Sequence, residues 1–398
     1  MKKTWVNIQD VLFFQEGPGV RNTQYTTEGV KLLNVANLVD GKVDLSTSDR
    51  YISEEEAYGK YKHFLCNEGD FVIASSGIKV EYIDKKMGFI DKSMLPLCMN
   101  TSTIRFRVLD ENQLRIRYFM YYLKSQHFKG QLFRYITGSA QLNYGPSHLK
   151  KMVMPLIDLV KQDEIIACMD KIQSIIEMRQ QELYELDNLV KARFVEMFGD
   201  PVINEKEWVT KPLLDMGICK NGMNFHYNDC GVEINCLGVG DFKNLSVIDN
   251  TEQLSTVSLN EMPSEEYLLK DDDIVFVRSN GNKALVGRSV AVYPGDIPTT
   301  FSGFCIRYRK QDDAVTIPYL LRVLKTDSIR RKMAGRGANI QNLNQQILGN
   351  LIIPVPPIEL QNQFSDFVKK IDKSKVAIKK SLDETQILFD SLMQKYFG

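Results

Sequence analysis

The sequence lacks the features of a secreted or membrane-bound protein. Nowhere do about 18 apolar residues follow one another, and the start, MKKTWVNIQDVLFF, has no apolar run long enough for a signal peptide. The seven cysteines are scattered and form no CxxC pair, as expected for free thiols in a reducing compartment. We therefore expect a cytoplasmic protein with no membrane partner.

The sequence also lacks the motifs of common enzymes. It has no GxxxxGK[ST] phosphate loop, no GxGxxG, no HExxH, and no Asn or Asp followed by Pro-Pro and an aromatic residue, as amino-methyltransferases have. The four histidines have no Cys or carboxylate at metal-ligand spacing. Ser75-Ser76-Gly77 lacks the GxSxG pattern and a matching base. We expect no catalytic residue, no metal site and no cofactor bound by this chain.

A net charge is absent too, because 50 basic residues balance 50 acidic ones, and taken alone this argues against a nucleic-acid partner. The basic residues are unevenly distributed, however. Seven Lys or Arg stand against two acids in 105–134, and nine stand against three in 303–336. Positive charge is therefore concentrated at the same place in each half of the chain.

What the sequence does contain is one long helical segment written twice. The segments 155–199 and 354–398 both begin at Pro and end in Phe-Gly, and they lie 199 residues apart without a gap (354 − 155 at the prolines, 398 − 199 at the glycines). Neither has Pro or Gly within its apolar pattern. Each predicts a helix of roughly 35 to 40 residues, on the order of 55 to 60 Å long.

Both segments carry an apolar seam at alternating steps of four and three residues. This 3.5-residue period is the narrow stripe of a coiled coil, which needs a partner, and the obvious partner is the other copy. Polar residues interrupt the seam at Arg179 and Arg193 in the first copy and at Lys375 and Thr385 in the second. The apolar seam residues are Ile165, Met169, Ile172, Ile176, Leu183, Leu186, Val190 and Met197, then Phe364, Val368, Ile371, Ile378, Leu382, Phe389, Leu392 and Tyr396.

The direction of helix pairing is left open by this pattern. In an antiparallel pair with aligned ends, Arg179 faces about Leu382 and Lys375 faces about Leu186. No two charges of one sign then collide. This is a hint toward the antiparallel arrangement, and a parallel pair stays an alternative.

The segments before each helix repeat as well. EGDFVIASSG at 68–77 matches DDDIVFVRSN at 271–280, IRYFMYYLKSQ at 116–126 matches IPYLLRVLKTD at 317–327, and TGSAQLN at 137–143 matches RGANIQN at 336–342. A period of about 200 residues indicates a domain duplication and a pseudo-two-fold molecule. We assign globular domains to 1–154 and 200–353, and long helices to 155–199 and 354–398.

Two polar loops are duplicated, one after an apolar strand and one after the basic, aromatic stretch. Arg, Asn, Gln, Ser and Lys on such loops read base edges and hold phosphates, although each could equally be a residue of a solvated turn. The candidate DNA-binding residues are Ser75, Ser76, Gly77, Lys79, Arg105, Gly138, Ser139, Gln141 and Asn143 in the first half, and Arg278, Ser279, Asn280, Asn282, Lys283, Arg336, Asn339, Gln341 and Asn342 in the second.

With these residues in view, the chain resembles the specificity subunits of type I restriction-modification systems over essentially its whole length. The resemblance is carried by the strand and loop GDFVIASSG and DDIVFVRSN. It is carried equally by the approach to each helix, GSAQLN before MVMPLIDLVKQDEI and GANIQNLN before LIIPVPPIELQNQF. The first copy departs by having Leu156 and Ile157 where the second has Val355 and Pro356.

The resemblance implies an α+β fold with two pseudo-symmetric, mixed α/β target-recognition domains, joined by two long helices that form an antiparallel coiled coil. Each domain would read one half of an asymmetric, bipartite site in double-stranded DNA. The helices would set the spacing between the halves and dock two methyltransferase subunits, and motor and nuclease subunits would join the full complex. S-adenosylmethionine and ATP with Mg²⁺ would then bind to the partner subunits.

Two other functions are compatible with the sequence. A non-catalytic interaction scaffold with two peptide-binding domains would use the same coiled-coil rod, and salt-dependent DNA binding separates it from a DNA reader. An enzyme with an unrecognised site would show methyltransferase activity in the chain alone. The clustered basic residues favour the DNA reader over the scaffold, and methyltransferase assays with and without partner subunits separate the DNA reader from the enzyme.

Overall fold

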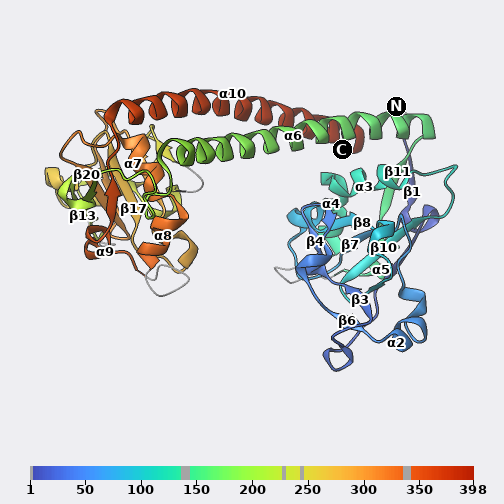
Figure 1. Cartoon of the computed structure of the whole chain (residues 1–398). Helices are drawn as coiled ribbons and strands as arrows, with labels where there is room; N and C mark the ends of the chain where they lie inside the picture. Colours follow the sequence, from blue (N-terminus) through green and yellow to red (C-terminus); the bar gives the residue numbers. More distant parts are fainter. Residues whose placement is uncertain (1–2, 136–143, 226–229, 243–245, 335–341) are drawn as a thin grey trace. The chain divides into compact units, whose positions relative to one another are not determined.

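The computed structural model describes residues 3–135, 144–225, 230–242, 246–334 and 342–398 (Figure 1). The chain divides into two compact units: unit 1 joins Met1–Gln180 to Lys380–Gly398, and unit 2 is Gln181–Lys379. Each unit contains part of both long helices, α6 (Leu159–Phe198) and α10 (Ile358–Phe397). The compact units therefore cut through the two helices, whereas the repeat pattern marked the helices as separate segments.

The globular part of unit 1 is built on a four-stranded antiparallel sheet in the order β2-β10-β7-β8, with a smaller sheet β6-β3-β9 and the pairs β4-β5 and β1-β11. Its strands are β1 (Thr4–Asn7), β2 (Leu12–Glu16), β3 (Val30–Leu33), β4 (Leu38–Val39), β5 (Lys42–Val43), β6 (Tyr51–Ile52), β7 (Phe71–Ala74), β8 (Met87–Phe89), β9 (Leu97–Met99), β10 (Thr103–Val108) and β11 (Val153–Leu156). Its short helices are α1 (Ile8–Val11), α2 (Glu54–Tyr58), α3 (Ile116–Lys124), α4 (Gln126–Tyr135) and α5 (Pro146–Leu149).

Unit 2 has the same plan with a five-stranded sheet, β13-β20-β17-β18-β15, a smaller sheet β16-β14-β19 and the pair β12-β21. Its strands are β12 (Thr210–Pro212), β13 (Gly217–Asn221), β14 (Val232–Leu237), β15 (Val247–Ile248), β16 (Thr256–Leu259), β17 (Asp273–Val277), β18 (Ser289–Val292), β19 (Thr299–Phe301), β20 (Cys305–Lys310) and β21 (Ile352–Pro354). Its short helices are α7 (Ile317–Leu324), α8 (Asp327–Ala334) and α9 (Gln345–Gly349).

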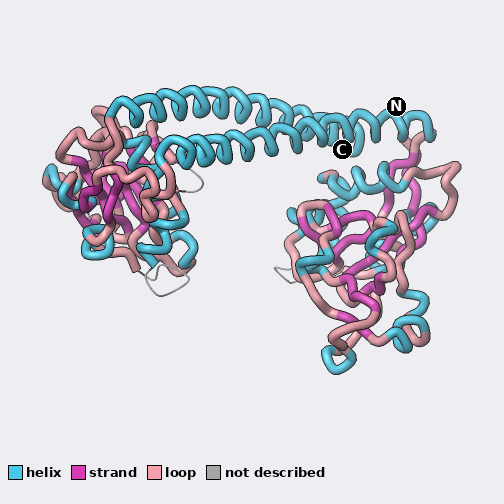
Figure 2. The backbone as a smooth tube through the Cα atoms, in the orientation of Figure 1, coloured by secondary structure: helices cyan, strands magenta, loops and turns pink. Residues whose placement is uncertain are grey.

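The two globular parts share topology, as the duplication predicts. The central strand β10 pairs antiparallel with β2 and β7, and β20 pairs in the same way with β13 and β17. The pairs β3-β9 and β14-β19 are both parallel. In each unit α3 or α7 lies between the strands and the long helices (Figure 2). The mixed α/β character of both domains is therefore confirmed.

The long helices α6 and α10 pack against each other in the antiparallel direction. In unit 1 the Arg179 guanidinium donates hydrogen bonds to the Ser381 carbonyl and to Thr385 Oγ1. In unit 2 the Lys375 ammonium forms an ion pair with Asp187. Because these partners lie beside the positions expected for aligned antiparallel ends, the antiparallel coiled coil is confirmed and the parallel alternative is wrong.

All the predicted apolar seam residues are buried or half-buried. The predicted seam omits four buried apolar residues near the ends of the helices, namely Phe194, Phe198, Met393 and Phe397. The Phe397 ring lies 5.1 Å from the Tyr118 ring, within the core of unit 1. The helix ends thus have a wider apolar face than a coiled-coil stripe, because they also complete the cores of the globular parts.

A buried glutamine fastens each long helix to its globular part. Gln162 accepts a hydrogen bond from the Arg115 amide at 2.8 Å and donates to the carbonyls of Gln113 and Ile157, both at 2.8 Å. Gln361 repeats these contacts with the Thr316 amide and two carbonyls. Both side chains are fully buried, so the two amides are satisfied inside the protein.

The seven cysteines are unpaired. Burial raises the pKa of both Cys66 and Cys98 to about 12, which keeps these thiols protonated and unreactive at neutral pH. Within the described parts of the chain, no helix combines the length and the apolarity needed to cross a membrane.

Candidate nucleic-acid interface

The first candidate loop follows β7 in unit 1 and β17 in unit 2, strands that are buried along their whole length. In unit 1 the loop turns at Gly77, whose φ of +76° favours glycine, and Gly77 and Lys79 are exposed. In unit 2 the exposed residues are Asn282 and Lys283, and the half-buried ones are Arg278, Ser279 and Asn280. Most of the first-loop candidates therefore reach the surface.

In each unit the first candidate loop is hydrogen-bonded to a described residue near the second candidate segment. The Tyr144 amide donates to the Ser75 carbonyl at 3.0 Å, and the Leu343 amide donates to the Arg278 carbonyl at 2.9 Å. Tyr144 and Leu343 are equivalent in the repeat (343 − 144 = 199), and Asn342 beside Leu343 is exposed. The candidates Gly138, Ser139, Gln141, Asn143, Arg336, Asn339 and Gln341 lie outside the described residues.

A third segment, which sequence reasoning missed, completes each site. The Ser75 amide donates to the Ser102 carbonyl at 2.8 Å, and the Arg278 amide donates to the Phe304 carbonyl at 2.7 Å. The cause is strand register: Ala74 at the end of β7 pairs with Thr103 at the start of β10. No motif marks this turn, and only the strand pairing reveals it.

We define two loop clusters from these contacts. The unit 1 loop cluster comprises 75–79, 101–103 and Tyr144. The unit 2 loop cluster comprises 278–283, 302–304 and 342–343. Their backbones form the same hydrogen bonds, but their side chains differ.

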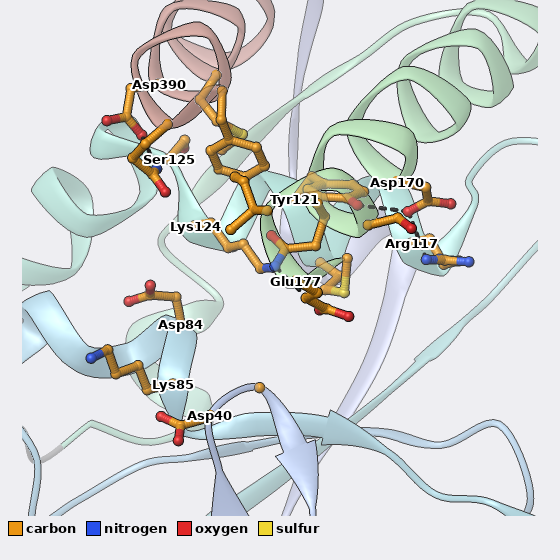
Figure 3. Close-up of a pocket in the computed structure, with 18 of the residues that line it drawn as sticks. Asp40, Asp84, Lys85, Arg117, Tyr121, Lys124, Ser125, Asp170, Glu177 and Asp390 are labelled. Atoms are coloured by element: carbon orange, nitrogen blue, oxygen red, sulfur yellow. Dashed lines mark hydrogen bonds and ion pairs between the residues drawn. The ribbon is translucent and has the colours of Figure 1, made fainter. Parts of the chain in front are cut away.

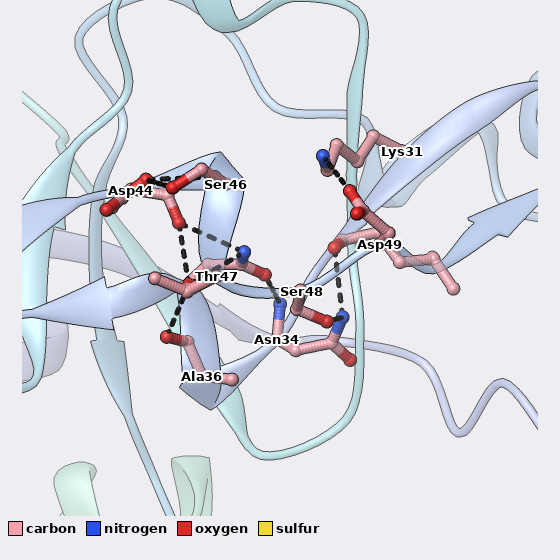
Figure 4. A network of polar contacts seen from close by, with 10 residues as sticks. Lys31, Asn34, Ala36, Asp44, Ser46, Thr47, Ser48 and Asp49 are labelled. Atoms are coloured by element: carbon pink, nitrogen blue, oxygen red, sulfur yellow. Dashed lines mark hydrogen bonds and ion pairs between the residues drawn. The ribbon is translucent and has the colours of Figure 1, made fainter. Parts of the chain in front are cut away.

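Polar contacts join residues of the segment 31–49 (Figure 4), and Asn34 of this segment connects them to the turn in the unit 1 loop cluster. Asn34 is buried, and its side-chain oxygen accepts a hydrogen bond from the Asn100 amide group at 2.8 Å. The Asn100 carbonyl in turn accepts from the Thr103 hydroxyl at 2.7 Å. Ser102 lies between Asn100 and Thr103 with a φ of +67°. The network therefore holds this turn in one conformation.

Two candidates from the sequence are buried and must be corrected. Arg105 is 4% exposed, and its guanidinium donates to the His63 and Leu65 carbonyls, each at 2.6 Å. Its position on β10 points into the domain, and burial lowers its pKa, as it does for the equivalent Arg307. The Ser75 side chain is 1% exposed. Neither side chain is placed to contact DNA, although the Ser75 backbone anchors the cluster.

The basic stretches are less positive at the surface than their composition indicates. Aspartates distant in sequence neutralise many of the bases. The pairs are Arg107–Asp70, Arg115–Asp163, Arg117–Asp170, Lys129–Asp84 and Arg309–Asp273. Arg134, Arg331 and Lys332 are exposed. The charge pattern alone therefore overstated the basic surface, because it counted groups that serve the fold.

Each unit has a groove between its α3 or α7 helix and the long helices. In unit 1 the groove has a volume of about 1410 Å³ and is lined by Tyr121, Lys124, Asp170 and Asp390, among others (Figure 3). The Tyr121 hydroxyl donates to Asp170 at 2.6 Å. Burial lowers the pKa of Lys124. The groove is mixed in charge, which suits a protein surface better than a phosphate backbone.

The unit 2 groove is smaller, about 380 Å³, and lies between α7 and the same two long helices. Lys325, the equivalent of Lys124, donates to the Ser246 hydroxyl at 2.8 Å. Burial lowers the pKa of Lys325 to about 8. The groove, like the loop cluster, is thus a duplicated feature.

The chain is similar in sequence to known proteins. It matches the family described as "Type I restriction modification DNA specificity domain" twice, at residues 19–188 and 205–386. It is 24% identical over 297 residues to the type I restriction enzyme StySPI specificity subunit of Salmonella potsdam, covering 70% of this chain and 63% of that protein. It is 23% identical over 190 residues to the MjaVIII specificity subunit of Methanocaldococcus jannaschii, covering 47% and 43%. The chain spans less than two thirds of the length of these relatives.

Solved structures share the fold. The S subunit of a type I restriction-modification system from M. genitalium superposes with a TM-score of 0.54 at 17% identity, covering 100% of this chain and 96% of that one. A chain from a study of complex assembly and conformational transition in the type I R-M system superposes with a TM-score of 0.58 at 14% identity, covering 99% and 97%. At these identities the likeness shows the fold alone. Because the family match recurs in both halves and spans most of the sequence, the chain belongs to the family of type I restriction-modification DNA specificity domains.

Proposed function

We propose that this chain is the DNA-specificity subunit of a type I restriction-modification complex, in which each globular domain reads one half of an asymmetric, bipartite site. The observation that carries the proposal is the doubled loop cluster. The amides of Ser75 and Arg278 make the same backbone bond, to Ser102 and Phe304, while the side chains around them differ. One backbone frame with two sets of side chains is what two readers of different sequences require.

Roles within the loop clusters follow from side-chain chemistry. The exposed Lys79 and Lys283 are suited to phosphate contacts, which position a protein on the duplex. Arg278 is suited to a guanine edge, where a guanidinium can form two hydrogen bonds. Ser76, whose hydroxyl bonds the Ser102 hydroxyl at 2.6 Å, can turn toward a base edge. Arg278 and Ser76 are the proposed base-reading groups, and the two lysines are the proposed phosphate contacts.

The coiled coil is suited to set the distance between the half-sites. Each long helix has 40 residues, hence a length of about 60 Å at 1.5 Å per residue. One turn of B-DNA is about 34 Å, so a rod of this length covers an unread spacer. The polar contacts of Arg179 and Lys375 within the seam would fix the helix register, as polar seam residues do in other coiled coils.

The long helices and the two grooves are the proposed docking sites for two methyltransferase subunits. The segment 151–200 carries ten acids against six bases, and Glu177, Glu185 and Glu196 are exposed outside the seam. Such a face would repel DNA and is free to meet a protein. S-adenosylmethionine would bind to these partners, and ATP with Mg²⁺ to motor and nuclease subunits that join the complex in the cytoplasm.

Selection from random duplexes tests the proposal, with the chain purified together with methyltransferase subunits. We expect two short specified blocks separated by an unspecified run, and an affinity that falls steeply with salt. A peptide-binding scaffold would enrich no DNA sequence. Enrichment of one continuous block would contradict reading by both domains.

A further inference from the structure

Phe304 is a large apolar residue in the unit 2 loop cluster. Its side chain is 62% exposed, on the turn between β19 and β20. The neighbouring residues in the cluster, Arg278 and Ser279, are polar and half-buried. Single exposed apolar side chains are common on protein surfaces, so exposure alone assigns no role. The fixed position of this residue is the more informative property.

The backbone of Phe304 is held from several sides. Its carbonyl accepts from the amides of Arg278 and Ser279, at 2.7 and 3.4 Å, and its own amide donates to the Ser302 hydroxyl at 3.3 Å. The turn packs closely on Gly222, where a Cβ atom would lie 2.1 Å from the Ser302 carbonyl oxygen. The ring is therefore presented on a firmly held turn, so the backbone loses little conformational entropy when the ring contacts a partner.

The equivalent position in unit 1 is a hydroxyl residue. Ser102 accepts the matching bond from the Ser75 amide at 2.8 Å, and its hydroxyl bonds the Ser76 hydroxyl at 2.6 Å. The same place in the duplicated frame is thus polar in one domain and apolar in the other. Among base edges in the major groove, thymine alone presents a methyl group, and apolar side chains contact it.

We propose that Phe304 is a specificity-determining residue of the second recognition domain, and that its ring contacts the 5-methyl group of a thymine in the second half-site. This inference rests on the proposed function, because it assumes that the loop clusters read DNA. It adds to that function a named residue and a named chemical group. The first domain, with Ser102 in this place, reads no methyl group there.

The test replaces each thymine of the second half-site by deoxyuridine, which lacks only the methyl group. The affinity of the complex with methyltransferase subunits is measured on each duplex. At one position we expect the wild-type complex to bind about fourfold more weakly, as for the loss of one buried methyl-sized group. The F304S complex should bind thymine and deoxyuridine duplexes equally, whereas F304L should still distinguish them.

A matched control is Phe133→Ser, because Phe133 is a phenylalanine of similar exposure, 69%, on α4 of unit 1. F133S should keep the wild-type preference for thymine in the second half-site. Thermal unfolding of F304S and F304L shows whether each variant is folded, and a folded F304L that treats both bases alike overturns the inference.

Three other results would also overturn it: a second half-site without thymine, a deoxyuridine effect that F304S leaves intact, or F304S weakening assembly with the methyltransferase subunits without DNA. Failure of the proposed function has a different signature. In that case the wild-type complex selects no bipartite DNA at all.

Discussion

Arg278 and Ser75 occupy equivalent positions in the two loop clusters, but their side chains differ in burial and in hydrogen bonding. The Arg278 guanidinium reaches the Gly303 carbonyl only at 3.4 Å, a long and weak hydrogen bond. Ser75 is instead buried and donates to Glu16 at 3.3 Å. Arg278 can therefore turn away from this contact at little cost, and under the proposed function it is a base-reading group that the first domain lacks.

We predict that Arg278→Ala relaxes recognition at one position of the second half-site. Losing a two-bond contact to a base should cost about 1–3 kcal/mol of discrimination, measured by binding to duplexes with single substitutions. The first half-site should stay unchanged. Lys283→Ala serves as the comparison, since a phosphate contact weakens binding to all sequences alike. If Arg278→Ala behaves like Lys283→Ala, Arg278 does not read a base.

At this scale the sequence located polar loops that do reach the surface. The polar loops after β7 and β17 were visible as motifs, and Lys79, Asn282 and Lys283 are indeed exposed. The burial of Arg105 could not be predicted from the sequence, because its guanidinium is held by the carbonyls of His63 and Leu65, about 40 residues away. Phe304 carries no motif, and only the register of β17 with β20 brings it beside Arg278.

Lys325 connects protonation to stability. Burial lowers its pKa from 10.5 to about 8. The charged groups that face it are Arg322 on α7, Asp187 on α6, and Asp372 and Lys375 on α10. Between about pH 8 and 10.5 the unfolded chain binds more protons at this site than the folded chain, so the folded protein becomes more stable as pH rises through this window.

We predict that Lys325→Met stabilises unit 2 at pH 7 and that this advantage shrinks between pH 8 and 10.5. The advantage at pH 7 has an upper limit of about 3 kcal/mol, because the variant avoids burying a charge. Urea unfolding of both proteins at several pH values measures it. Lys373→Met, an exposed site on α10, should give no such pH dependence. A constant difference between wild type and Lys325→Met across the window would contradict the prediction.

At the scale of elements, Gln162 and Gln361 join each long helix to the segment before α3 or α7. Each makes three hydrogen bonds while fully buried. Removing such a side chain leaves its buried backbone partners without a hydrogen bond, because water does not reach them. Each glutamine therefore acts as a structural clamp between the start of a long helix and its globular part.

We predict that Gln361→Ala destabilises unit 2 by about 2–4 kcal/mol, since it leaves buried backbone groups unsatisfied and opens a cavity. Hydrogen exchange should show faster opening around Thr316 and the start of α10. The nearby Gln363→Ala, at an exposed position, should change stability by less than about 0.5 kcal/mol. Equal effects of the two substitutions would show that the clamp contributes nothing.

We also predict that the coiled coil sets the spacer. Inserting seven residues, one heptad, into both α6 and α10 keeps the seam in phase. Each helix becomes about 10 Å longer. The preferred spacer should therefore grow by about three base pairs at 3.4 Å each. Inserting four residues lengthens the helices but shifts the seam. This insertion should reduce the activity of the complex with methyltransferase subunits. Site selection with both variants measures this, and a heptad variant that keeps the original spacer at full affinity would refute the role.

The elements were the most predictable part of the fold. The alternation of fours and threes predicted both helices and their seam, because a 3.5-residue period needs no tertiary information. Phe194 and Phe397 were missed because they follow the wider helical period, in which the helix ends turn toward the globular cores. The strand order could not be predicted, since it depends on pairings between segments far apart in sequence.

At the scale of the whole molecule, the duplication explains why one chain holds two globular domains of the same plan. Each compact unit takes part of both long helices, and unit 1 is closed by the last residues of the chain, Lys380–Gly398. Phe397 accordingly packs with Tyr118 and Tyr122 of α3. The offset of 199 residues predicted this pairing of the copies. It did not predict that the unit boundary falls inside the helices.

The central claim is that the two domains read two different half-sites. Base-resolution mapping of modified DNA, in a host that expresses this chain with its methyltransferase partner, tests it most directly. The account predicts one asymmetric motif of two specified blocks with an unspecified spacer, and exchanging 278–283 for 75–79 should alter one block only. A continuous or palindromic motif, or modification without sequence preference, would contradict it.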